Sequence, residues 1–166
     1  MAGCEPRYLS LVIAALRAVA DPAFNLVGVQ TTTGVTAPIF VVHGPIVDEL
    51  EINAGANCLG QGRRSNATIG RAIRLVLQNV GLAIPGKSDM ATHGIPGKYT
   101  WLIGENEAKS AWPAFHVSRG LAPGTSAITA LAAVGSIEVV FGDGTPEEIS
   151  ERLGRHMTPI GRRRYC

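Results

Sequence analysis

The stretch from Asn53 to Gly81, NAGANCLGQGRRSNATIGRAIRLVLQNVG, joins a glycine-rich loop to a helix with one apolar face. Its apolar residues recur at helical spacing, at Ile69, Ala72, Ile73, Val76 and Val80. Arg71, Arg74 and Gln78 fall on the other side. Gly81 is a natural C-terminal stop. We therefore predict a helix over Ala67 to Val80 that packs on the rest of the fold through this stripe.

Helical and strand patterns alternate on both sides of this helix. A helix is expected over Pro6 to Ala20, a short helical turn over Ile46 to Glu51, and a last helix from the Thr145-Pro146 capping signal to about His156. Strands are expected over Leu26 to Thr32, Pro38 to Val42, Tyr99 to Ile103, Ala127 to Ala133 and Ile137 to Phe141, with Leu82 to Lys98 irregular. This alternation predicts a single α/β domain over residues 1–166, with a mixed or mostly parallel sheet flanked by helices.

The glycine-rich loop before the helix is typical of an anion-binding site. Gly60 and Gly62 let the backbone approach a ligand, and Arg63 and Arg64 add positive charge. Ser65 or Asn66 is expected to cap the helix, which leaves other backbone N–H groups of its first turn for a carboxylate or phosphate. The loop matches neither GxxxxGK[ST] nor GxGxxG. The alternative is a simple turn with solvated arginines.

Three cysteines offer candidate nucleophiles. Cys4 precedes the first helix and Cys58 lies in the glycine-rich loop, two settings that can activate a thiol. The alternative for each is a small packed residue. The third is Cys166; the odd number and the absence of CxxC spacing indicate free thiols in a reducing compartment.

His43 is the candidate general base, because it ends an apolar strand just before Gly44-Pro45, where α/β proteins place functional side chains. The alternative is a hydrogen-bonded structural histidine. Glu105 and Glu107 follow another expected strand and could act as acid and base or bind a metal, or simply form the first turn of a helix. The remaining histidines are His93, His116 and His156. No two histidines have metal-ligand spacing, so no metal ligands are assigned, and the cofactor is left unknown.

Composition bears on partners and location. Apolar residues make up 46% and charged residues 17% of the chain, which favours a homo-oligomer or a complex with a second subunit. A net charge of +2 is too small to indicate nucleic acid. No stretch has the length of a membrane span, so a cytoplasmic protein is expected. The basic run Arg162-Arg163-Arg164 is interpreted as a solvated tail, with contact to an acidic partner or phosphate as the alternative.

Five segments together resemble one bacterial family. They are AGCEPRYLSLVIAAL, VVHGPI, INAGANCLGQGRRSNATIGRAIRLVLQNVG, PGKYTWLIGENE and HVSRG, spanning roughly Ala2 to Gly120. Members of this family are encoded beside, or fused to, a segment with a (seleno)Cys-Gly-Ser-Cys motif, and are loosely similar to the selenoprotein components of glycine- and betaine-type reductases. The resemblance implies a thiol- or selenol-linked enzyme in two parts. This chain has no Cys-Gly-Ser-Cys, so a second polypeptide would supply that motif.

These observations predict one subunit of an enzyme that acts on a small molecule with an anionic group. The expected reaction is thiol-linked cleavage or reduction of a carbon–heteroatom bond, with Cys4 or Cys58 as nucleophile and His43 as base. Two alternatives remain open. One is a non-catalytic binding or scaffold subunit that completes a partner's active site. The other is a metal- or cofactor-dependent lyase that uses His43, His93 and Glu105.

Overall fold

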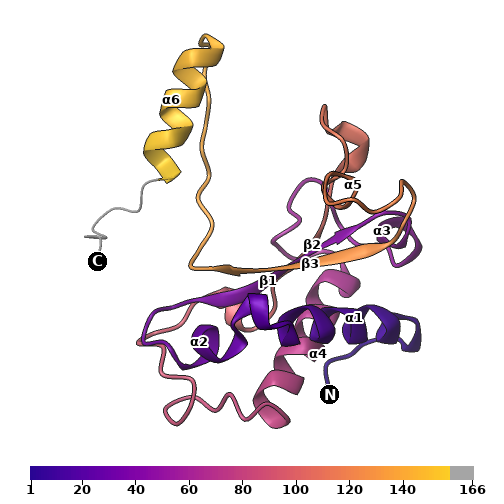
Figure 1. The fold of residues 1–166 in the computed structure, drawn as a ribbon, viewed down its shortest axis with the longest axis vertical. Helices are drawn as coiled ribbons and strands as arrows, with labels where there is room; N and C mark the ends of the chain where they lie inside the picture. Colours follow the sequence, from indigo (N-terminus) through magenta and orange to yellow (C-terminus); the bar gives the residue numbers. More distant parts are fainter. Residues whose placement is uncertain (158–166) are drawn as a thin grey trace. The chain divides into compact units, whose positions relative to one another are not determined.

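The computed structural model describes residues 1–157 of the chain. Its internal contacts divide the chain into a first unit, Met1–Val134, and a second unit that starts at Gly135. Figure 1 traces both units along the sequence. The first unit contains the hydrophobic core and the three strands found within residues 1–157.

A three-stranded mixed sheet forms the centre of the first unit. Its order is β2-β1-β3, with β1 (Ala37–His43) in the middle. The short strand β2 (Leu102–Gly104) runs parallel to β1, and β3 (Ala127–Ala133) runs antiparallel to it. The β1–β3 ladder pairs Ala37 with Ala133 and His43 with Ala127. The predicted α/β class with a mixed sheet is therefore confirmed.

Helices α1 (Leu9–Ala20) and α4 (Arg64–Asn79) supply most of the core around this sheet (Figure 1). Helix α1 packs against α4 and β3, and α4 packs against β2. The buried core includes Tyr8, Leu11, Ala15 and Val19 near the N-terminus, Phe40 and Val42 of β1, and Ile69, Ile73 and Leu77 of α4. The helical spacing of these side chains is what places one face of each helix on the core. A 3₁₀ turn, Pro6–Tyr8, leads into α1, so the predicted helix over Pro6 to Ala20 is confirmed.

The short helices occupy the connections between these elements. Helix α3 (Ile46–Glu49) follows β1, and α5 (Phe115–Ser118) lies between β2 and β3. Further 3₁₀ turns are Pro22–Phe24, Pro96–Lys98 and Glu107–Lys109.

Strands β1 and β3 agree with the predicted strands to within a residue at each end. Strand β2 is shorter than predicted, because the turn at Pro96–Lys98 keeps the backbone irregular up to Trp101.

Two predicted strands are wrong. The segment Leu26–Thr31 is a helix, α2, whose first turn is capped by Asn25: this residue has a left-handed backbone and its side chain accepts a hydrogen bond from the N–H of Gly28. A cap of this kind outweighs the β-branched character of the segment. The segment Ile137 to Phe141 has no strand partner within residues 1–157, and most of it is exposed.

The start and the faces of α4 also differ from expectation. The helix begins at Arg64, three residues early, and its N-cap residue, Arg63, makes no side-chain cap. Ser65 and Asn66 therefore lie inside the first turn and do not cap the helix. Leu77 is buried in place of the predicted Val80, and Arg74 is buried although it was expected on the open face.

The second unit contains helix α6 (Pro146–Met157), which has no buried residue. Its start confirms the predicted capping box. The Thr145 N–H donates to the Glu148 carboxylate over 2.8 Å, and the Glu148 N–H donates to the Thr145 hydroxyl over 3.3 Å. The basic run Arg162 to Arg164 and Cys166 lie outside the described residues.

Within residues 1–157, no single helix is long and apolar enough to cross a membrane. The helical segments Pro6–Ala20 and Pro22–Thr31 together reach the length and composition of a span, but they are bent by 67° at the break between them.

Candidate metal centre

Parallel pairing of β1 and β2 brings His43 and Glu105 together. Val42 is in register with Gly104, so the two strands end at the same edge of the sheet. The Glu105 N–H then donates to the Val42 carbonyl over 2.8 Å and extends the ladder by one residue. His43 is the last residue of β1 and Glu105 directly follows β2, and their side chains meet, with His43 Nδ1 2.5 Å from Glu105 Oε2.

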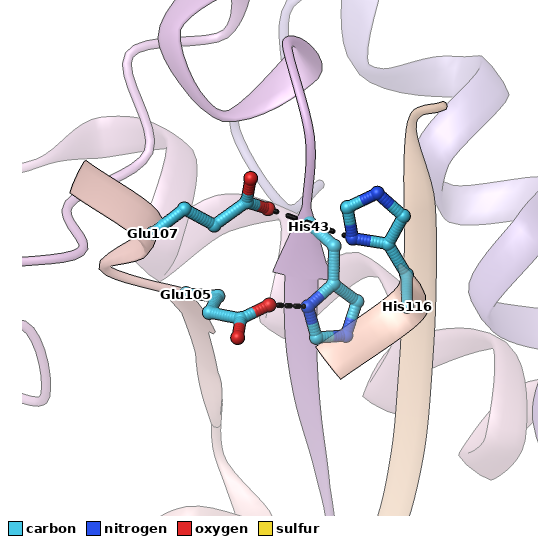
Figure 2. A group of neighbouring side chains, drawn as sticks. All are labelled: His43, Glu105, Glu107 and His116. Carbon is cyan, nitrogen blue, oxygen red and sulfur yellow. Dashed lines mark hydrogen bonds and ion pairs between the residues drawn. The ribbon is translucent and has the colours of Figure 1, made fainter. Parts of the chain in front are cut away.

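Glu107 and His116 complete a group of four side chains at this edge, which Figure 2 shows converging. One ligand atom from each of the four lies within 4.8 Å of the others. Glu107 begins a 3₁₀ turn just after β2, and His116 projects from α5. The name histidine–glutamate cluster is used below for His43, Glu105, Glu107 and His116.

Backbone hydrogen bonds hold both carboxylates in place. The Phe115 N–H donates to both oxygens of Glu105, over 2.9 and 3.1 Å, and the Gly44 N–H donates to Glu107 over 2.7 Å. Gly44 has φ of +78°, and a Cβ there would overlap the carbonyl oxygen of Thr125. Glycine is therefore required directly after His43 for this N–H to reach Glu107.

His43 is held on both ring nitrogens. Besides the contact of Nδ1 with Glu105, Nε2 lies 2.8 Å from the Thr129 hydroxyl on β3. Its side chain is only 1% exposed, and the Phe115 ring stacks on it with the ring centres 5.8 Å apart. Arg119 in turn lies over Phe115 at 4.9 Å. Phe115 and Arg119 thus cover the cluster from the side of α5.

His116 differs from His43, because neither of its ring nitrogens has a hydrogen-bond partner in the described part of the chain. It is 3% exposed, and the Glu107 carboxylate lies 3.6 Å from its Nδ1. A buried polar group without a partner costs about 1–3 kcal/mol, so such a group in a folded protein calls for an explanation. Aimed at two carboxylates and a second imidazole, His116 has the surroundings of a metal ligand.

The predicted anion-binding loop has its polar side chains engaged by the fold. The Ser65 hydroxyl donates to the Glu51 carbonyl. The Asn66 amide is buried, accepts from the Asn53 N–H and donates to the Leu102 carbonyl. Arg64 donates to the Gly3 carbonyl and pairs with Glu5. Arg63, Gly60 and Gly62 are exposed. The loop as an anion site thus stays a prediction, with fewer free donors than its sequence indicates.

The two described cysteines are free thiols outside the cluster. Cys4 donates through its thiol to the Thr68 carbonyl over 3.2 Å. Cys58 lines a small hollow with Gly60 and Asn66. Within residues 1–157, neither thiol is bonded to His43, the predicted base, so thiol-linked cleavage remains a prediction that no contact supports.

The structure separates His93 from the other members of the predicted lyase site. His93 is exposed in the long loop, where it lines a cleft with Arg74 and Lys98.

The sequence identified His43, Glu105 and Glu107 as candidate site residues, but it indicated no role for His116 or Thr129. The one sequence signal for the cluster was the run Gly104-Glu-Asn-Glu at the end of a strand. His116 does not lie at a spacing typical of metal ligands from either glutamate, so the sequence did not point to it.

Comparison with protein-family models, with curated proteins and with solved structures found no match. The function must therefore be argued from the geometry of this chain.

Proposed function

We propose that the first unit is the metal-binding part of a small-molecule enzyme, with a divalent first-row transition metal such as Zn²⁺ held by the histidine–glutamate cluster. The observation that carries this proposal is the convergence of two buried histidines and two carboxylates, one histidine having no other partner. Two imidazoles and two carboxylates form a nitrogen and oxygen donor set suited to Zn²⁺, Fe²⁺ or Mn²⁺.

Binding of the metal would replace the proton that lies between His43 and Glu105. Ligand atoms of a tetrahedral Zn²⁺ site are about 3.4 Å apart, given bonds of about 2.0–2.2 Å. The pair His43–Glu105, at 2.5 Å, would therefore open by about 1 Å and give up the proton between its two atoms. Thr129 can keep His43 oriented through Nε2, as outer-shell partners of metal-bound histidines do.

A metal in this position supplies Lewis-acid chemistry, either polarising a substrate oxygen or activating water. The lyase alternative raised by the sequence fits this chemistry better than thiol attack, with Glu107 and His116 taking the place assigned to His93. The family resemblance and the need for a second polypeptide remain part of the proposal: a partner chain could contribute the thiol or selenol and the rest of the active site.

Co²⁺ titration of the full chain, freed of any histidine tag, tests this proposal. We expect one Co²⁺ per chain with visible absorption bands of a four- or five-coordinate site. His116→Gln and Glu107→Gln should weaken binding by more than the roughly 10–100-fold typical of outer-shell changes. His93→Gln is the matched control and should bind as the parent does. Absence of bands in the parent protein, or equal affinity in all four proteins, would refute the proposal.

A further inference from the structure

A second site lies away from the histidine–glutamate cluster, in a cleft of about 540 Å³ between α4 and the loop of residues 85–99. Its size falls within the range of small-molecule pockets. Both Pro-Gly-Lys tripeptides of the sequence border it, through Pro85 and Gly86 of the first and Pro96 and Lys98 of the second. Both copies of the repeated tripeptide therefore border the same cleft.

The charges on the cleft are unbalanced. Arg71, Arg74 and Lys98 line it and carry three positive charges, whereas Asp89 is the single carboxylate among its lining residues. Arg74 and Lys98 share that carboxylate, each at 2.6 Å. With His93 neutral, the lining carries a net charge of +2. Buried or half-buried cations without matching anions favour an anionic ligand, because it restores the balance at low desolvation cost.

Arg71 is the cation that is left for a ligand. It is half-buried, lies over the Tyr99 ring at 5.9 Å, and takes part in none of the ion pairs found within residues 1–157. The cleft is also lined by the apolar residues Pro85, Ala91, Ile95 and Pro96. A guanidinium, an aromatic ring and apolar lining residues together suit a molecule with one anionic head and an apolar body.

We propose that this cleft binds a small organic anion, with Arg71 as the principal partner of its carboxylate or phosphate group and Tyr99 packing on its body. The site is independent of the metal centre. The cleft shares Arg74 and Lys98 with a smaller cavity that Pro38 also lines, near the start of β1, whereas His43 ends that strand. Pro38 and His43 lie five residues apart on β1, about 16 Å, and none of the four residues of the histidine–glutamate cluster lines the cleft.

Calorimetric titration of the full, metal-free chain tests the cleft directly, with three probes: benzoate, its neutral analogue benzamide, and inorganic phosphate. We expect benzoate to bind at roughly millimolar concentration, as befits a fragment of nine heavy atoms. Benzamide, which lacks the charge, and phosphate, which lacks the apolar body, should bind at least about tenfold more weakly.

Arg71→Gln should weaken benzoate binding by about tenfold or more, the effect of one charge-assisted hydrogen bond. Tyr99→Leu should weaken it to a lesser degree, and since Tyr99 is 71% exposed this change should leave the fold intact. Arg17→Gln, at an exposed arginine of α1 outside the cleft, is the control, and thermal melting checks all three variants. If benzoate fails to bind, if benzamide or phosphate binds as tightly, or if Arg17→Gln has the same effect as Arg71→Gln, the proposal is overturned. None of these results depends on metal binding, so the two proposals fail or succeed separately.

Discussion

At the scale of single residues, Asp89 shows how a buried charge fixes a loop to a helix. It is 5% exposed and accepts hydrogen bonds from Arg74 of α4 and Lys98 of the 3₁₀ turn before β2. Burial alone would raise the pKa of its carboxyl, but the hydrogen bonds from Lys98 and Arg74 outweigh burial and hold the pKa below the ordinary 3.8. The ionised form therefore stabilises the folded chain.

Asp89→Asn should lower the free energy of unfolding at pH 7 by roughly 3 kcal/mol, because it leaves Arg74 buried without a counter-charge.

The depressed folded-state pKa of Asp89 also determines how the stability of the protein depends on pH. The stabilisation from ionised Asp89 is complete above about pH 4 and is lost as pH falls through the lower folded-state pKa. Urea unfolding from pH 7 down to pH 2 should therefore show a smaller acid-induced loss in Asp89→Asn than in the parent. Parallel pH profiles would contradict this account.

At the scale of elements, the close approach of α4 to the segment before β2 positions the C-terminal edge of the sheet. The Thr100 hydroxyl bonds to the carbonyl oxygens of Asn66 and Ala67 in the first turn of α4. Gly70, buried in the same helix, makes room for this contact. A Cβ on Gly70 would overlap the Thr100 hydroxyl and come within 3.0 Å of the Trp101 nitrogen. Strand β2, and with it Glu105, thus depends on a glycine inside a helix.

Gly70→Ala should destabilise the protein although alanine favours helix by about 1 kcal/mol over glycine. Forcing a methyl group against backbone costs about 1–3 kcal/mol, so we expect a net loss of about 1 kcal/mol or more by denaturant unfolding. The matched control is Gly154→Ala in α6, where an added Cβ meets nothing within 4 Å. This variant should keep or slightly raise helicity. Equal stability of Gly70→Ala and the parent would show that the segment at Thr100 moves aside at no cost.

At the scale of the whole molecule, the first unit holds everything that the two proposals need. Its core residues run from Tyr8 to Leu102, the cluster extends to His116, and Thr129 of β3 supports His43. The second unit contributes an amphipathic helix with no buried residue, and apolar side chains such as Ile137, Val140 and Met157 are exposed there. The expected homo-oligomer or second subunit, inferred from composition, remains a prediction.

A chain ending at Val134 should therefore fold and keep both sites. We expect a cooperative thermal transition within a few degrees of the full-length protein and unchanged Co²⁺ stoichiometry, with light scattering on both forms to record their assembly. An unfolded or aggregated truncated chain would show that the residues after Val134 are needed to stabilise the sheet, and would contradict the independence of the first unit.

The sequence by itself determined the elements whose signals are local. Helical periodicity predicted α1 and α4, the apolar run Pro38 to Val42 predicted β1, and Thr145 with Glu148 predicted the start of α6. It also predicted His43 as a functional side chain at a strand end. Where the local signal was ambiguous, as in the short apolar segment Leu26 to Thr32, the prediction failed, because a single cap residue decided between helix and strand.

Only the tertiary structure decided which polar residues meet. The pairing of β1 with β2, 62 residues apart along the chain at Val42 and Gly104 and parallel in direction, sets His43 beside Glu105, and the α5 turn adds His116. Likewise Arg74, which helical periodicity placed on the open face, is buried because Gln30 and Asp89 come from other segments to meet it. Helical periodicity shows which face of a single element is apolar. Strand register and the paths of loops bring together residues that lie far apart in the sequence. Both depend on packing between elements, which no local pattern encodes.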